Sequence, residues 1–123
     1  MRITLCLALV LLVATSACSS SESEDLYGVW ITPGNSIYLS LNEDDSWGIA
    51  YHEGIDPFDW GTFTFDGELL TFSTDPDNVT CPDKPGTYDT AFTAEGDLEL
   101  NVVEDLCRER ARTVTGTLVP YSP

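Results

Sequence analysis

Apolar and polar residues alternate along most of the chain beyond residue 26. Leu98, Leu100 and Val102 are separated by polar neighbours, and residues 37–41 repeat the pattern. A period of two places successive side chains on opposite faces of a β-strand. Turn-forming residues interrupt the chain about every 8 to 12 residues, and no segment has the period of a long helix. The pattern predicts an all-β, antiparallel domain.

Eight strands are expected, each bounded by residues that favour turns. Their predicted ranges, in chain order, are residues 27–32, 36–41, 47–52, 59–65, 68–73, 87–93, 98–104 and 113–119. Pro33-Gly34-Asn35, Asp66-Gly67 and Glu95-Gly96-Asp97 are turn sequences between them, and Asp66-Gly67 is typical of a type I′ hairpin. Short connections of this kind favour a meander, in which consecutive strands pair.

The alternation leaves each predicted strand with a single apolar face. Eight such strands can close into a small barrel, which buries these faces on one another and leaves no exposed sheet edge. A sandwich of two sheets is the main alternative. We therefore predict an eight-stranded antiparallel meander barrel over residues 26–123, as a single domain.

Residues 74–85 form the longest predicted loop, because the prolines at positions 76, 82 and 85 exclude it from a central strand. Cys81 lies in this loop, and Cys107 precedes the last predicted strand. In an oxidising compartment such a pair is expected to form a disulfide. Metal ligation and a redox dithiol are the alternatives, although the chain has no Cys-x-x-Cys spacing and its only histidine is His52.

The N-terminus has the order of residues found in a secretory signal peptide. Met1-Arg2 is followed by an uncharged apolar run over residues 3–13 and then by small residues. The run is only about 16 Å long as a helix, roughly half of the hydrocarbon thickness of a bilayer. We expect residues 1–17 to be removed, and Cys6 within them to act only as a small apolar residue.

Ala14-Thr15-Ser16-Ala17-Cys18 resembles the lipobox of bacterial lipoproteins. The resemblance implies diacylglycerol on the thiol of Cys18, cleavage before it, and anchoring of the mature chain to a membrane by acyl chains such as palmitate. Ordinary signal peptidase is the alternative, since Thr15 and Ala17 satisfy its requirement for small residues. Residues 18–25 are polar after the cysteine and are expected to be a flexible tether. Ser19 is not an aspartate, which favours the outer membrane if the host has two.

The mature part is strongly acidic. All 21 acidic side chains lie beyond Cys18 against only four basic ones, a formal charge of −17. Phosphate recognition relies on basic patches, so nucleic acid is not expected as a partner. The acidity fits either a highly solvated surface or the binding of cations or of a basic protein.

Gly28-Val29-Trp30 near the first predicted strand gives Gly-x-Trp, and Cys107-Arg108-Glu109-Arg110 precedes the last one. Together with the strand order, these residues resemble the lipocalin-like barrels of exported bacterial proteins. The resemblance implies that Trp30 closes one end of the barrel, next to Gly28, and that Arg110 packs across its ring. A guanidinium over an indole contributes about 0.5 to 2 kcal/mol. Lipocalins carry a helix before their last strand, for which almost no room is expected here between Glu104 and Thr113.

Few residues suggest chemistry. His52 is expected to be an exposed residue at the end of a strand, and without a second histidine it does not indicate a transition-metal site. Two acidic loops, at residues 43–45 and at Asp75, Asp77 and Asp83, are conceivable calcium ligands but lack the spacing of an EF-hand. We expect solvated turns, no metal and no cofactor.

Aromatic residues gather around residues 52–57. Trp47, Phe58 and Trp60 either belong to the core or line a ligand pocket at the barrel mouth. No serine has a Gly-x-Ser-x-Gly context and acid pairs cannot be singled out, so we expect no enzyme activity.

Three functions remain at this stage. The leading hypothesis is a lipid-anchored protein of the cell envelope that binds a small apolar or amphipathic ligand at one mouth of the barrel. The alternative is an envelope interaction module, such as an inhibitor or assembly factor, that uses acidic loops on a basic protein. A purely structural role in the envelope is the third.

Overall fold

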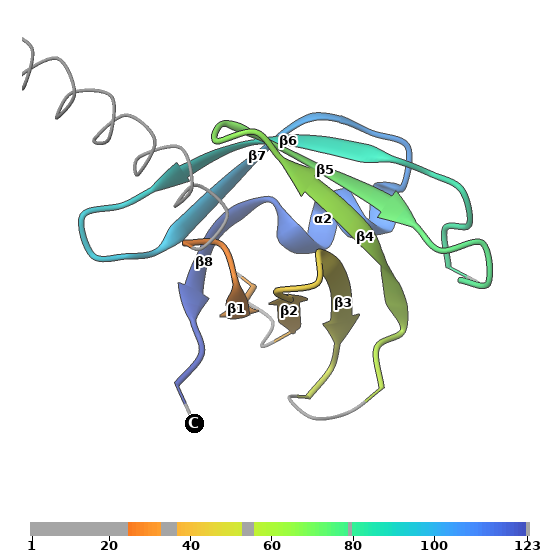
Figure 1. Cartoon of the computed structure of the whole chain (residues 1–123), viewed down its shortest axis with the longest axis horizontal. Helices are drawn as coiled ribbons and strands as arrows, with labels where there is room; N and C mark the ends of the chain where they lie inside the picture. Colours follow the sequence, from red (N-terminus) through yellow and green to blue (C-terminus); the bar gives the residue numbers. More distant parts are fainter. Residues whose placement is uncertain (1–24, 33–36, 53–55, 79, 123) are drawn as a thin grey trace, which may run out of the picture.

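The computed structural model describes residues 25–32, 37–52, 56–78 and 80–122. They form a closed barrel in which consecutive strands pair antiparallel and the last strand pairs with the first (Figure 1). The strands are β1 (Gly28–Ile31), β2 (Tyr38–Leu41), β3 (Ser46–Ala50), β4 (Asp59–Phe65), β5 (Leu69–Thr74), β6 (Gly86–Phe92), β7 (Leu98–Asp105) and β8 (Gly116–Pro120). A short helix, α2 (Arg108–Val114), lies between β7 and β8. The predicted all-β meander barrel is confirmed, and its closure excludes an open sandwich.

The register follows from the alternation of apolar residues. Phe63 of β4 pairs with Phe72 of β5, and Phe65 pairs with Leu70, so the apolar faces of the two strands coincide. A shift by one residue would turn every one of these side chains toward solvent. Burial of the inner faces therefore specifies the pairing.

The end of the chain corrects one prediction. Residues 113–119 were expected to form the last strand, with no room for a helix before it, but Thr113 and Val114 close α2 and β8 begins at Gly116. Arg110 and Val114 are four residues apart, lie on one face of the helix and are both buried. Residues 108–112 are helix formers, and packing of this face against the barrel keeps the β-branched residues Thr113 and Val114 in the same helix.

The Asp66-Gly67 connection also differs from the expected type I′ turn. Such a turn needs positive φ at both central residues, whereas only Gly67, at 99°, has it here. The carboxylate of Asp66 instead accepts hydrogen bonds from the backbone N–H groups of Glu68 and Leu69. The side chain of Asp66 therefore closes a longer loop than the sequence pair suggested.

Connections in a meander barrel alternate between its two ends. The loops β2–β3, β4–β5 and β6–β7 lie at the end where the chain enters β1, which we call the tether end. The opposite end, which we call the helix end, holds the β5–β6 loop and α2. No helix in the described residues is long and apolar enough to cross a membrane. The predicted signal peptide, Cys18 and the predicted turn at residues 33–35 lie outside the described residues.

Two connections at the helix end are joined covalently. Cys81 of the β5–β6 loop and Cys107, directly before α2, form a disulfide with a Cα–Cα distance of 5.8 Å. Both side chains are buried. The predicted disulfide is therefore present, and it fixes the start of the helix to the long loop.

Candidate functional site

Large side chains fill the interior of the barrel. The largest fully buried side chains are Trp47, Arg110, Tyr88, Phe72, Leu26, Leu39, Leu41, Ile49, Leu70, Leu98, Leu100 and Leu118. The rings of Trp47 and Phe72 meet edge to face with 5.0 Å between their centroids, and Phe72 meets Tyr88 in the same way at 5.5 Å. The interior is a packed core of the kind found in small barrels rather than a ligand cup.

One buried cation, Arg110 of α2, reaches into this core at the helix end. Its guanidinium is 2.6 Å from the carboxylate of Asp105 and donates a second hydrogen bond to it from Nε at 2.8 Å. It also donates to Thr74 Oγ1 at 2.9 Å and to the carbonyl oxygen of Lys84 at 2.7 Å. Side chains from β5 and β7, with the backbone of the β5–β6 loop, therefore hold α2 in place.

Asp105 is the centre of this network. Its carboxylate also accepts hydrogen bonds from Tyr88 and from the backbone N–H of Cys107. Burial and the hydrogen bond to Asp105 raise the pKa of Tyr88. Burial by itself would lower the pKa of Arg110, but its hydrogen bonds with Asp105 and the charge of that carboxylate outweigh burial, so the pKa is raised. Arg110 is therefore a permanent cation with structural partners.

The predicted tryptophan partner of Arg110 is wrong. The guanidinium lies over Trp47, 5.5 Å from the ring centroid, and over Phe72 at 5.8 Å. Trp30 is buried elsewhere, where its indole N–H donates to the carbonyl oxygen of Leu26 at 2.9 Å. The ring contacts of Arg110 are therefore with Trp47 and Phe72 and not with Trp30.

Gly28 does not pack against the barrel end either. It is exposed, and a Cβ added to it would meet nothing within 4 Å. Its φ of 143° is what calls for glycine, since side chains disfavour that conformation. The role of Gly28 is to set the entry of the chain into β1.

A second buried polar group, Asp59, begins β4. Its carboxylate accepts a hydrogen bond from the side-chain amide of Asn78, and Asn78 in turn accepts from the backbone N–H of Thr80 at 2.8 Å. Burial raises the pKa of Asp59, against the opposing effects of the Asn78 hydrogen bond and the positive charge of Arg110. The amide of Asn78 is thereby committed to ordering the β5–β6 loop.

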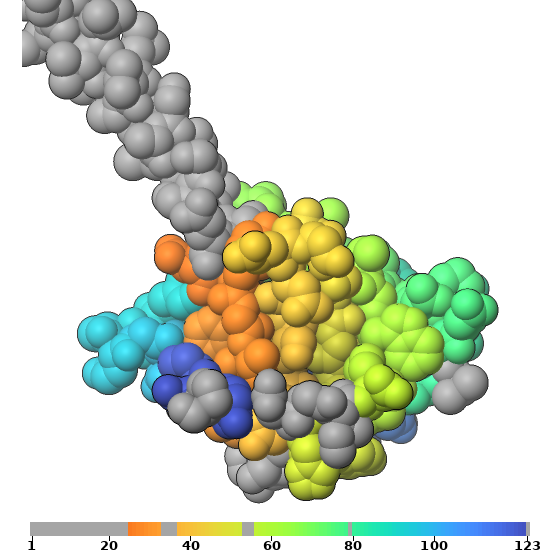
Figure 2. All heavy atoms as spheres, turned by 60° about the horizontal axis from the view of Figure 1, so that its bottom comes forward, coloured from red at the N-terminus to blue at the C-terminus, as the bar shows by residue number. Residues whose placement is uncertain are grey.

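A hollow of about 320 Å³ lies on the outer face of β2, β3 and β4, outside the barrel. It is lined by Ser40, Asn42, Ser46, Trp47, Gly48, Ala50, Pro57, Trp60 and Gly61. Figure 2 shows the face on which these strands lie side by side. The register places Ser40 opposite Gly48, and Gly48 opposite Trp60, so one row crosses all three strands.

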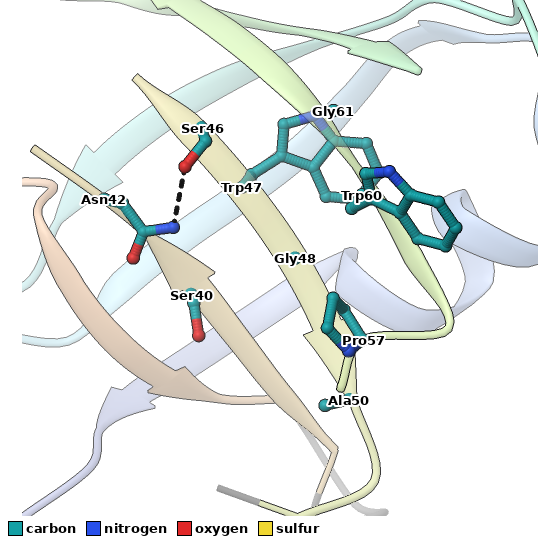
Figure 3. A pocket seen from close by; sticks show the side chains of 9 residues that line it. All are labelled: Ser40, Asn42, Ser46, Trp47, Gly48, Ala50, Pro57, Trp60 and Gly61. Atoms are coloured by element: carbon teal, nitrogen blue, oxygen red, sulfur yellow. Dashed lines mark hydrogen bonds between the residues drawn. The ribbon is translucent and has the colours of Figure 1, made fainter. Parts of the chain in front are cut away.

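The close-up shows polar side chains on one side of the hollow and an aromatic ring on the other (Figure 3). Asn42 donates to Ser46 Oγ at 2.9 Å, and Trp60 projects beyond β4. A second hollow of about 260 Å³ is lined by Asp56, Pro57 and again Trp60. Trp60 therefore borders open space in both.

The three aromatic candidates have separate positions. Trp47 is buried in the core and donates its indole N–H to the carbonyl oxygen of Ser73 at 3.2 Å. Phe58 is half-buried against the core and stacks on Tyr51 with 4.6 Å between ring centroids. Trp60 is half-buried on the outer face. Trp47 and Trp60 both line the larger hollow, but only Trp60 lies on the outer face, and Phe58 lines neither hollow.

The small residues of β3 are a sign of this hollow that is visible in the sequence. In an alternating strand Gly48 and Ala50 should be exposed, yet both are buried. A Cβ on Gly48 would lie 3.1 Å from Pro57 Cβ, so Pro57 lies over the outer face of the strand. Gly48 and Ala50, followed closely by Pro57, were the available signal for such a fold-back.

The residues expected to stay out of metal chemistry have ordinary surroundings. His52 is exposed just after β3. Asp44 accepts from the backbone N–H of Ser46, and Asp75 from that of Asp77, as in Asx turns. Among the described residues the one group with metal-ligand geometry is Cys81, Cys107 and Glu109, whose two sulfur atoms are joined in the disulfide.

Charge is distributed unevenly between the two ends. The loops of the tether end carry acidic side chains and no basic ones: Glu43, Asp44, Asp45, Asp66, Glu68, Glu95 and Asp97. All basic residues beyond residue 17, Lys84, Arg108, Arg110 and Arg112, lie at the helix end. The loops of the tether end therefore carry only negatively charged side chains.

No protein-family profile matches this chain, and no curated protein or solved structure is significantly similar to it.

Proposed function

We propose that the mature chain is a lipid-anchored, non-enzymatic binding protein of the bacterial cell envelope, and that it binds its ligand on the outer face of the barrel. The lipobox resemblance supports the anchor on Cys18, and the polar tether supports a domain held close to a membrane. The observation that supports binding on the outer face is the filled interior. Side chains occupy the inside of the barrel, whereas Trp60 lines a hollow outside it.

This proposal changes the leading hypothesis in one respect. A small apolar ligand at a barrel mouth would need room among residues such as Leu39, Phe72 and Leu98, each of which is fully buried. Insertion of a ligand there would displace well-packed side chains, at a cost of several kcal/mol. The resemblance to lipocalin-like barrels thus supports the strand architecture alone. We place the binding surface on the outside of the barrel and not in its interior.

The anchor is tested by expressing the full chain in a bacterium and measuring the intact mass of the membrane-bound product. We expect cleavage before Cys18, acyl chains on it, and release from the membrane only by detergent. Cys18→Ala should abolish acylation, whereas Cys6→Ala is a matched control within the leader and should leave the product unchanged. An unmodified Cys18 in protein that is soluble without detergent would refute the anchor.

A second candidate function is an interaction module for a basic envelope protein. The negative charge of the tether-end loops favours this function, because a cluster of like charges accelerates association with an oppositely charged surface. Replacing Glu43, Asp44 and Asp45 by their amides should weaken such a complex at low salt. The comparison is with replacement of Asp75 and Asp77 at the helix end. A complex that persists at high salt, or that is not weakened by the replacements at residues 43–45, would count against this function.

A further inference from the structure

The three tryptophans of the chain differ in one respect that bears on binding. Trp30 and Trp47 are 5% and 2% exposed, and each donates its indole N–H to a backbone carbonyl oxygen. Trp60 is half-buried, and its indole N–H has no hydrogen-bond partner among the described residues. No fully buried polar side-chain atom in the described part lacks a partner, so this N–H is accessible to solvent. Trp60 thus offers both a ring and a free donor.

The polar groups beside Trp60 offer the complementary functions. Ser40 has no side-chain partner among the described residues, and Asn42 uses its amide N–H toward Ser46 while its amide oxygen stays free. Ser46 is already engaged, since its hydroxyl donates to Asp44. The hollow therefore offers a hydroxyl, an amide oxygen and an indole N–H, which both donate and accept hydrogen bonds.

The side chains that line the larger hollow limit the charge that a bound ligand can carry. None of the side chains that line the larger hollow is ionisable, although the chain carries 21 acidic residues. A cation would find no carboxylate among the lining side chains. An anion would find no basic group and would be repelled by a net charge of −16. A neutral ligand fits best.

We infer that the outer hollow between Ser40 and Trp60 binds a neutral saccharide. The apolar C–H face of a sugar ring stacks on the indole of Trp60, and its hydroxyl groups exchange hydrogen bonds with Ser40, Asn42 and the indole N–H. Gly48 lies under Pro57, and both residues line the hollow together with Trp60. A volume of about 320 Å³ lies at the small end of ligand sites and suits about one or two sugar rings.

This inference rests on the proposed function for its setting, since an envelope protein meets polysaccharides, but its test is independent of the anchor. The purified full-length protein, labelled with ¹⁵N at tryptophan, is titrated with cellobiose and with N,N′-diacetylchitobiose in the millimolar range. Three indole N–H signals are expected from the ordered chain. That of Trp60 should exchange fastest with water and should alone shift saturably, while those of Trp30 and Trp47 stay in place.

Variants assign the site. Trp60→Ala should weaken binding at least about tenfold, and Ser40→Ala should weaken it less, because one neutral hydrogen bond is replaced by water. Phe92→Ala is the matched control, since Phe92 is an aromatic residue of β6, 41% exposed, that does not line the hollow. It should leave the affinity unchanged. The titration of the unaltered protein needs no variant, so it decides the question even if Trp60→Ala fails to fold.

The outcomes separate the alternatives. No shift of the Trp60 signal with either disaccharide, or equal shifts of all three indoles, would overturn the inference. So would tighter binding of the anionic disaccharide digalacturonate, since the hollow would then not be selective for neutral ligands. An acylated protein that binds no saccharide overturns this inference alone, whereas saccharide binding by an unacylated protein overturns only the anchor.

Discussion

The buried pair Arg110 and Asp105 provides the sharpest test of how this barrel is held together. Both side chains are fully buried, and the ion pair is accompanied by hydrogen bonds to Thr74, to the backbone of Lys84 and from Tyr88. Arg110→Met keeps much of the aliphatic bulk over Trp47 but leaves the carboxylate of Asp105 without a cation. Breaking one partner of a buried pair costs about 3 to 5 kcal/mol. For a small domain whose total stability is about 5 to 15 kcal/mol, this is a large fraction.

The measurement is urea unfolding at equilibrium, followed by tryptophan fluorescence with the disulfide intact. Arg112→Met is the matched control, because Arg112 lies on the same helix and is exposed; its cost should stay within about 0.5 kcal/mol. Asp105→Asn completes a double-mutant cycle. The double variant should lose less than the sum of the two single losses, with a coupling of about 1 to 3 kcal/mol.

Two results would refute the reasoning. Equal costs for Arg110→Met and Arg112→Met would mean that the buried cation contributes nothing beyond its bulk. Strict additivity in the cycle would mean that Arg110 and Asp105 act independently, against their separation of 2.6 Å.

Three further predictions concern stability. Gly61→Ala should cost at least about 1 to 3 kcal/mol, because its Cβ would lie 1.8 Å from the carbonyl oxygen of Ser73 in the paired strand; the exposed neighbour Thr62→Ala should change urea stability far less. Replacing Cys81 and Cys107 by alanine should cost roughly 3 to 4 kcal/mol by the chain-entropy estimate, for residues 26 apart in sequence, and equal midpoints with and without reductant in the parent would contradict it. The raised pKa of Asp59 means that the folded state binds its proton more tightly than the unfolded chain, so this group stabilises at low pH. That contribution is lost as the pH rises from 3.8 through the raised folded pKa. Asp59→Asn should therefore gain stability relative to the parent between acid and neutral pH, and parallel urea midpoints across that range would argue against it.

The class of fold and much of its topology follow from the order of residues alone. A period of two, interrupted by turn residues, is a local signal, and the strand 59–65 was placed at the bounds that the structure shows. The disulfide was also accessible from sequence, because Cys81 and Cys107 are the two cysteines that follow Cys18. These features depend on the order of residues and need no knowledge of distant contacts.

The contacts between residues far apart in the chain follow only from the tertiary structure. Val114 is β-branched and reads as strand, yet burial of one face with Arg110 makes its segment helical. The lipocalin resemblance predicted that Arg110 packs across Trp30, whereas the tertiary structure places its guanidinium over Trp47 and Phe72. The position of Trp60 outside the barrel depends in the same way on the strand register and on Pro57 folding over Gly48. Such contacts join residues far apart in the chain, and their free energy exceeds the local preferences that a sequence pattern records.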